Sequence, residues 1–357
     1  MIKLQDHIDK PNPDSYLSVL AKNHWDYLNP RTKKTNDYAR GALVHKCKSL
    51  YTNCDSASYI KAYANGSRKT AQRHKKFFML LKKYNYKFLK QLIFCPPSDF
   101  NFLRTEILNI LFESDIFIRK GRKISQTPFG ALLSNNLFDY KKFRSSEYCV
   151  KMYLDMGFLL SSCPYCNDRT IEIVKKNVAI GTVPQNIAYF DLDHFYPKSQ
   201  NPFFALSFYN LIPSCSICNS KEKLDKTFST ITHIHPYQTS FDDCYMFQFS
   251  STALLGVDNY EILINKKTAY DFENITDFNL LNRYENRMED VKTMIRHYQN
   301  YHRSIITNKE RELFVKYFTD PNPGVMYKKL ILKGDRSKLY RDVIKGIDVD
   351  NIIGLAD

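Results

Sequence analysis

The spacing of apolar and charged positions predicts amphipathic helices in the first part of the chain. From about Ser67 to Phe94, apolar side chains recur at helical intervals on one face, while lysines occupy the other. The apolar face consists of Phe77, Leu80, Leu81, Tyr84, Phe88 and Leu92, and the lysines are Lys76, Lys83, Lys87 and Lys90. The proline pair at 96–97 ends this helix. We expect a shorter helix before Pro30 and another over residues 100–118.

Further along, the pattern changes to short strands. Residues 171–180 and 186–195 read as two strands with a Val-Pro turn between them. An apolar segment follows at 203–212, and the sequence NSKEKLDK after Cys218 resembles the start of a short helix. The order is therefore strand, loop, strand and helix.

The last part of the chain mixes both patterns. Two short strands, YMFQFSS and NYEILIN, precede a strongly helical stretch at 278–306. The whole pattern predicts a mainly helical α+β protein. We expect a basic, mostly helical domain at 1–145, a chemically active domain at 146–228 and a mixed or helical region at 229–357.

Composition adds a strong charge asymmetry to this outline. The chain has 357 residues, 43% of them hydrophobic, which suffices for two or three globular domains. Its net charge is +15, and the whole excess lies in residues 1–150. A polyanion would meet that region first, so nucleic-acid contact is favoured over a merely solvated face. For the helix at 67–94 alone, contact with a phosphate backbone and an ordinary solvated surface are equally favoured, and its basic face could equally bind an acidic partner. With no apolar run that could span a membrane and no leader pattern, we expect a cytoplasmic protein without membrane contact.

Four of the nine cysteines form two closely spaced pairs, whereas the other five show no close pairing. Cys163 and Cys166 lie in SCPYCN, and Cys215 and Cys218 lie in SCSICN. Two such pairs can close a tetrahedral shell around Zn²⁺ without leaving an open position, which predicts a structural zinc site. An iron–sulfur cluster would use the same ligands and is the less favoured alternative.

Residues that can cleave a phosphodiester bond lie between the two cysteine pairs and just after the second. His194 is suited to take a proton from water, and Asp193 offers hard oxygen ligands to Mg²⁺ or Mn²⁺. Asn219 follows Cys218 directly and could complete the divalent-ion site. We expect Asn210 to bond to backbone and to orient the loop that carries His194.

Other polar residues in this stretch have lesser expected roles. Lys221 or Lys223 could contact the phosphate. His233 and His235, in THIHP, could hold a metal, but a packing role before the proline is favoured.

The motifs LDHFYPKS (192–199), YNLIPSC (209–215) and CSICNSK (215–221) resemble the HNH endonucleases, the ββα-metal nucleases. The resemblance covers about residues 160–230. It implies one divalent ion bound by Asp193 and Asn219, His194 as general base, and Asn210 supporting the loop. The third motif position is often His in that family but is Asn219 here. Glu222 stands where family members often carry lysine.

The flanking segments DHFYPKS, ALSFYNLIPSC and HPYQTSFDD narrow the resemblance to HNH nucleases of bacterial anti-phage systems, of the Septu type or linked to retrons. It implies a metal-dependent nuclease that acts beside an ABC- or SMC-like ATPase in a defence complex. DNA is the favoured substrate. Two alternatives stay open: an effector that cleaves RNA such as tRNA, and a non-catalytic zinc-stapled module that binds nucleic acid or a partner.

Overall fold

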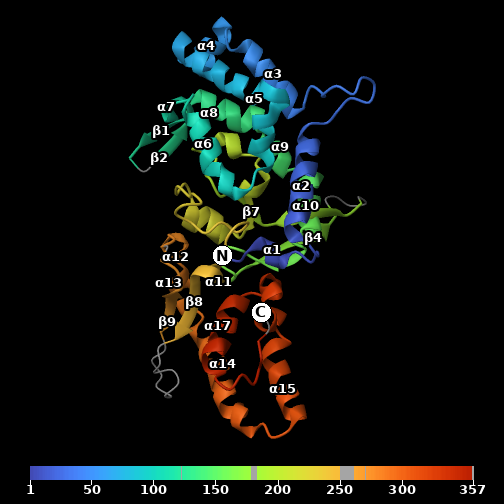
Figure 1. Cartoon of the computed structure of the whole chain (residues 1–357), viewed down its shortest axis with the longest axis vertical. Coiled ribbons are helices and arrows are strands. Elements are labelled where there is room, and N and C mark those ends of the chain that lie inside the picture. The colour runs from blue at the N-terminus through green and yellow to red at the C-terminus, as the bar shows by residue number, and fades with distance from the viewer. Residues whose placement is uncertain (122, 178–182, 250–260, 270, 356–357) are drawn as a thin grey trace.

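Helices form both ends of the molecule, and short strands lie between them (Figure 1). The computed structural model describes the chain except for residues 122, 178–182, 250–260, 270 and 356–357. The predicted fold class, a mainly helical α+β protein, is confirmed. In the described part of the chain, no helix combines the length and the apolar character that crossing a membrane requires.

The N-terminal part is helical apart from one small hairpin. Its helices are α1 (Leu4–His7), α2 (Pro13–Leu28), α3 (Leu43–Asn53), α4 (Ala57–Tyr63), α5 (Arg68–Phe94), α6 (Phe100–Leu108), α7 (Glu113–Ile116), α8 (Pro128–Leu132), α9 (Tyr140–Arg144) and α10 (Glu147–Asp155). Shorter helical turns are η1 (Pro97–Asp99) and η2 (Leu133–Leu137), and the hairpin strands are β1 (Phe117–Lys120) and β2 (Lys123–Gln126).

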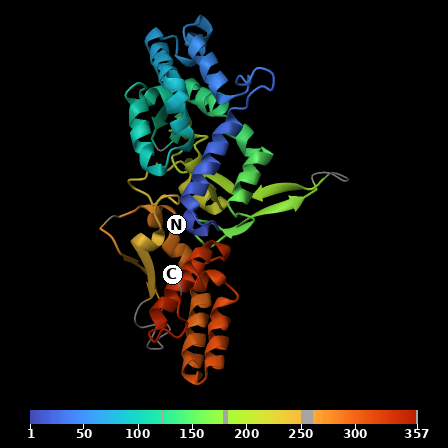
Figure 2. The same cartoon turned by 45° about the vertical axis from the view of Figure 1, so that its right-hand side comes forward.

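The central part holds most of the strands. They are β3 (Leu160–Ser162), β4 (Thr170–Lys176), β5 (Gln185–Tyr189), β6 (Asp191–His194) and β7 (Leu211–Ser214), with the helical turns η3 (Pro202–Phe204), η4 (Phe208–Asn210) and η5 (Cys218–Lys223). Strands β3, β4 and β5 form one antiparallel sheet, and β6 pairs with β7 in another. The β4–β5 hairpin extends away from the body of the molecule (Figure 2).

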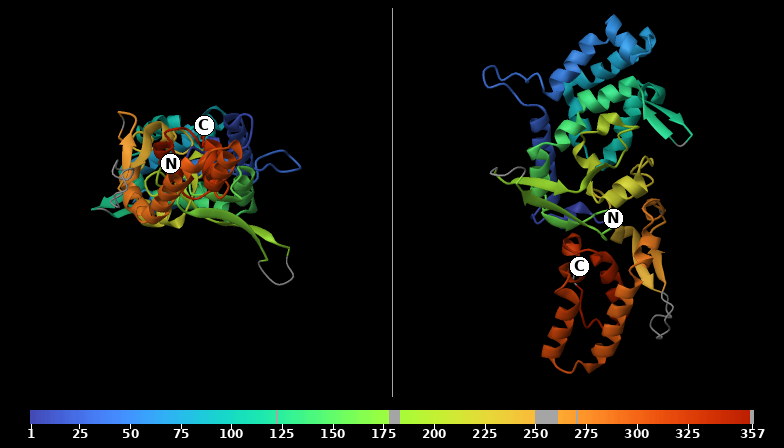
Figure 3. Two further views of the ribbon diagram at one scale, coloured as in Figure 1. Left: turned by 90° about the horizontal axis from the view of Figure 1, so that it is seen from below. Right: turned by 180° about the vertical axis from the view of Figure 1, so that it is seen from behind.

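The C-terminal part begins with α11 (Phe241–Cys244) and the pair β8 (Tyr245–Phe249) and β9 (Ile262–Lys266). The rest is helical: α12 (Asn274–Asp277), α13 (Leu280–Glu285), α14 (Met288–Tyr301), η7 (His302–Ser304), α15 (Asn308–Thr319), α16 (Pro323–Met326), η8 (Lys328–Lys333) and α17 (Ser337–Ile347). Helices α14 and α15 project together at the end of the molecule opposite α3 and α4 (Figure 3).

The predicted helix at 67–94 exists but is interrupted. Lys83 is extended, and the next three residues have left-handed φ angles of 49°, 53° and 61°. Tyr84 is therefore 84% exposed instead of lying on the apolar face. The halves pack on different neighbours. Phe78 in the first half contacts Cys47 of α3, whereas the carbonyl of Leu92 in the second half accepts from Ser207. Periodicity alone does not reveal such a turn.

Three other predicted elements are divided in the structure. The strand expected at 186–195 splits at Phe190 into β5 and β6, which belong to different sheets. The helix expected at 100–118 becomes α6, α7 and the start of β1. The helix expected at 278–306 breaks between α13 and α14, where Arg287 pairs with Asp168 beside the first cysteine pair. In the last case the break coincides with a tertiary contact, although the local pattern would continue the helix.

The buried hydrophobic residues form one contiguous cluster that crosses both expected domain boundaries. The Nε2 atom of His24 in α2 lies 2.9 Å from the carbonyl oxygen of Leu206, and the hydroxyl of Tyr196 donates to Asn101 over 2.7 Å. The three-domain division of the sequence stays a prediction. These contacts hold the N-terminal helices against the segment that carries the candidate site.

Candidate functional site

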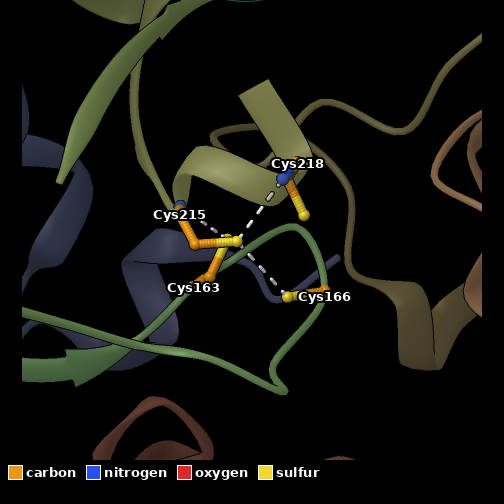
Figure 4. Close-up of side chains that lie close together, drawn as sticks. All are labelled: Cys163, Cys166, Cys215 and Cys218. Carbon is orange, nitrogen blue, oxygen red and sulfur yellow. Dashed lines mark hydrogen bonds between the residues drawn. The ribbon is translucent and has the colours of Figure 1, made fainter. Parts of the chain in front are cut away.

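The four paired cysteines converge on one buried point. The sulfur atoms of Cys163, Cys166, Cys215 and Cys218 all lie within 4.8 Å of one another. The first pair lies on the turn after β3, and the second lies at the end of β7 and the start of η5 (Figure 4). The cluster therefore joins two segments far apart in the sequence.

The surroundings of the cluster suit thiolates. The backbone N–H of Cys215 donates to the sulfur of Cys163 at 3.3 Å, and the guanidinium of Arg283 donates to the sulfur of Cys218 at 3.4 Å. Hydrogen bonds from the neighbouring cysteines lower the pKa of the Cys215 thiol, whereas burial raises the pKa of the Cys163 thiol well above its ordinary value. Four buried sulfur donors fit the closed tetrahedral shell of a structural Zn²⁺ ion. The residues predicted as zinc ligands are thus brought together, and they could hold that metal.

Strand β6 carries the Asp-His pair between these cysteines. It lies antiparallel to β7, with Asp191 opposite Ser214 and His194 opposite Leu211. Since Ser214 precedes Cys215, the register attaches β6 directly to the four-cysteine cluster. Successive side chains of a strand point to opposite faces, which separates Asp193 from His194.

His194 lies on the side of β6 that is covered by α9. Its ring packs edge-on against Tyr140 at 4.4 Å between centroids, and Nε2 lies 3.1 Å from the carbonyl oxygen of Ala205. A carbonyl only accepts hydrogen bonds, so Nε2 carries the proton and Nδ1 is left with a lone pair. Burial lowers the pKa of His194 to about 3, which keeps the ring neutral. Among the described residues, Nδ1 has no hydrogen-bond partner, so this nitrogen is available to accept a proton.

Asn210 is fully buried and bonds only to backbone. Its side-chain oxygen accepts from the N–H of Tyr196 at 2.7 Å, and its amide donates to the carbonyls of Tyr196 and Phe204. These bonds close the loop that follows His194. The predicted contacts of Asn210 are therefore confirmed, while its importance for catalysis stays a prediction.

Replacing Asn210 by alanine should destabilise the fold by about 2–4 kcal/mol, because the N–H and carbonyl of Tyr196 would lose their partner and the carbonyl of Phe204 would keep only its bond from Ser207. Urea unfolding monitored by circular dichroism measures this. Asn109→Ala, at an exposed position, is the matched control and should change the unfolding free energy by no more than about 0.5 kcal/mol. Equal stability of the two variants would contradict the role assigned to Asn210.

Asp193 is buried, and both of its carboxylate oxygens are engaged. The hydroxyl of Tyr165 donates to Oδ2 at 2.6 Å, and the ammonium of Lys223 lies 2.8 Å from Oδ1. Tyr165 belongs to the first cysteine turn, and Lys223 ends the helical turn that begins at Cys218. The carboxylate expected to bind Mg²⁺ or Mn²⁺ therefore already has a cation as its partner. As they stand, these side chains do not fit a divalent ion at Asp193.

Asn219 contacts a different carboxylate from the one expected. Its amide donates to Oδ2 of Asp191 at 3.0 Å, and the hydroxyl of Ser220 donates to the same oxygen. Asp191 and Asn219 are both half-buried. The structure thus holds Asn219 beside β6, as expected from its position after Cys218, but pairs it with Asp191.

The lysines near the site differ in exposure. Lys221 is exposed, whereas Lys223 is 1% exposed and also donates to the carbonyl of His194 at 2.7 Å. Lys223 therefore cannot reach a phosphate in this state.

Lys198 was not predicted from the sequence as a site residue, but its ammonium lies 4.9 Å from the centre of the Tyr140 ring that covers His194. It has no carboxylate partner among the described residues. Its position in the FYPKS motif was the available signal.

A second group of possible metal ligands lies nearby but already has a cation. His233, Glu273 and Asp277 place their ligand atoms within 4.8 Å of one another. Lys226 pairs with Asp277 at 3.1 Å, and His233 bonds to Asp277 and stacks on Phe228. His235 is buried against Phe195. The packing role predicted for the two histidines agrees with these contacts.

Comparison of the chain with protein-family models, with curated proteins and with solved structures found no match. What the site does must therefore be argued from its own geometry.

Proposed function

We propose that this chain is an endonuclease that hydrolyses phosphodiester bonds of nucleic acids, with His194 as the general base. The observation that carries the proposal is the state of that ring. A neutral imidazole, with Nε2–H directed at the Ala205 carbonyl and an unpartnered Nδ1, lies on a strand attached to the four-cysteine cluster. The resemblance of the motifs to the HNH endonucleases points to the same role.

The proposed reaction begins with a water molecule beside Nδ1 of His194. The ring takes a proton from this water as its oxygen attacks phosphorus, the bond to the 3′ oxygen breaks, and that oxygen takes up a proton from solvent water. The products carry a 5′ phosphate and a 3′ hydroxyl. Lys198, half-buried and close to the ring that covers His194, can offset the charge that develops on the phosphate. The requirement for Mg²⁺ or Mn²⁺ implied by the resemblance remains part of the proposal.

In this proposal, the N-terminal helices supply a surface for the nucleic acid. A surface groove between α3 and α4 is lined by Arg40, His45 and Lys46 together with hydroxyl and amide side chains, and no carboxylate is among its lining residues. Such a lining attracts phosphates and can donate hydrogen bonds to them. This groove supports the proposal that residues 1–145 contact the substrate. The preference for DNA over RNA rests on the resemblance of the motifs and not on the groove.

We further propose that the chain is the nuclease of an anti-phage defence complex with an ABC- or SMC-like ATPase. This part rests on the resemblance of the flanking motifs alone. An unrestrained nuclease would damage its own cell, so a partner that restrains it is expected. A purified chain that degrades host nucleic acid freely would count against such restraint.

A cleavage assay with the purified chain tests the proposal. Plasmid DNA and total RNA are incubated with Mg²⁺, Mn²⁺ or EDTA, with and without the products of neighbouring genes. We expect cutting of DNA that requires the divalent ion and that leaves 5′ phosphates. Cutting of RNA but not of DNA would favour the alternative, an effector that cleaves RNA such as tRNA. A zinc-loaded, folded chain that cuts neither under any condition would favour the non-catalytic binding module.

A further inference from the structure

The ammonium of Lys223 occupies the place beside Asp193 where a divalent ion would bind. It lies 2.8 Å from Oδ1 of Asp193 and 2.7 Å from the carbonyl oxygen of His194. Both groups are oxygen ligands of the type that Mg²⁺ and Mn²⁺ prefer. Tyr165 donates to the remaining carboxylate oxygen. The oxygen donors are thus assembled around a cation that belongs to the chain itself.

We propose that Lys223 and the divalent ion compete for Asp193, so that Lys223 keeps the nuclease site closed until it is withdrawn. This inference rests on the proposed function and assigns a means of regulation to the same site. An ion on Oδ1 would need the lone pairs that the ammonium now uses, and the two positive charges would repel each other at that distance. Metal binding at Asp193 and release of Lys223 are therefore one event.

The closed position, in which Lys223 pairs with Asp193, is stabilised by the residues around the pair. Lys223 and Asp193 are 1% and 3% exposed, and the ammonium also lies over the ring of Phe228 at 5.0 Å. A buried charge left without its partner is unfavourable. Lys223 therefore does not leave spontaneously in most molecules, and the chain on its own should bind the divalent ion weakly at this site.

Leu224, the residue after Lys223, is the point at which we propose that a partner releases Lys223 from Asp193. Leu224 has φ of 50° and ψ of −127°, which is strained for a side chain with a Cβ atom. Its side chain is also 61% exposed although it is apolar. A partner or substrate that takes hold of Leu224 would relax this strain. In this proposal, binding at Leu224 is the event that releases Lys223 from Asp193.

Binding of Mn²⁺ to the zinc-loaded full chain tests the competition directly. The free ion is followed by electron paramagnetic resonance, without nucleic acid. We expect Lys223→Met to bind Mn²⁺ at least tenfold more tightly than the natural chain, because the methionine side chain has similar length but no charge. Lys221→Met, at the exposed lysine two positions earlier, should bind as the natural chain does. A double variant that carries both Asp193→Asn and Lys223→Met should not show the tighter Mn²⁺ binding expected of Lys223→Met.

Equal Mn²⁺ affinity of Lys223→Met and the natural chain, with zinc content and circular dichroism retained, would overturn the proposal. If Lys223→Met does not fold, Leu224→Gly serves instead. Glycine adopts positive φ freely and should favour the closed position, weakening Mn²⁺ binding severalfold. Unchanged binding would then reject the proposal. The measurement needs no cleavage, so a chain that cuts nothing can still show the competition, and an active nuclease can still lack it.

Discussion

Replacing His194 by glutamine is expected to abolish nucleic-acid cleavage while leaving the fold and the bound zinc intact. Glutamine can place an N–H where Nε2 now donates to the Ala205 carbonyl, but it has no basic nitrogen where Nδ1 lies. A positioned general base contributes about 100- to 10,000-fold to the rate of such reactions. We therefore expect at least a hundredfold loss in initial rate. His194→Ala should lose as much activity and some stability in addition.

The comparison is made under whichever conditions allow the natural chain to cut. His45→Ala, at an exposed histidine of α3, is the matched control for removal of an imidazole. A modest effect there would report substrate contact in the α3–α4 groove and not chemistry. Full activity of a folded His194→Gln variant would remove His194 from the mechanism and with it the main support for the proposed function.

Loss of the zinc ligands should unfold the central part of the chain. A structural zinc site contributes about 10–16 kcal/mol of binding free energy in zinc-finger peptides, which is comparable to the net stability of a whole domain of about 5–15 kcal/mol. Without the metal, Cys166→Ser brings unpaired thiols and a hydroxyl into a fully buried site. We expect this variant to lose its zinc and to melt without a cooperative transition in that part of the chain.

Metal content by mass spectrometry and thermal unfolding by circular dichroism measure the effect. Cys149→Ser, a buried cysteine of α10 outside the cluster, is the control and should keep one zinc ion per chain with only a modest loss of stability. A Cys166→Ser variant with the same zinc content and melting temperature as the natural chain would contradict the assignment. Iron and visible absorption in the purified chain would favour the iron–sulfur alternative.

Comparison of the Cys166→Ser and His194→Gln variants distinguishes the role of the cysteine cluster from that of the proposed base. The zinc variant should lose activity because β6 loses its attachment through Ser214 and Cys215, and because Tyr165 and Lys223 no longer hold Asp193. The His194 variant should lose activity with all of these contacts in place. Finding both losses, with folding lost only in the first, would establish that the metal cluster supports the base without taking part in the reaction.

The sequence by itself determined the features that depend only on the spacing of residues within a short stretch of the chain. The cysteine pairs were recognised from their spacing, because two thiols at that spacing can face a single ion. Strands were expected at 171–180 and 186–195, and the structure has β4, β5 and β6 in these stretches. Strand β7, which pairs with β6, was not expected from the apolar segment at 203–212. The backbone contacts of Asn210 were expected from its place in an apolar loop, and they are present.

Only the tertiary structure decided which groups meet across these elements. No local pattern indicates that Tyr84 leaves its helix or that β5 and β6 belong to different sheets, because both depend on what packs on either side. Likewise, the pairing of Asp193 with Lys223 joins residues thirty positions apart. The sequence shows a carboxylate and an ammonium group at these two positions. We expected Asp193 to bind a divalent ion and Lys223 to contact the phosphate. Folding placed two opposite charges together in a buried site instead, because neither could be buried there alone.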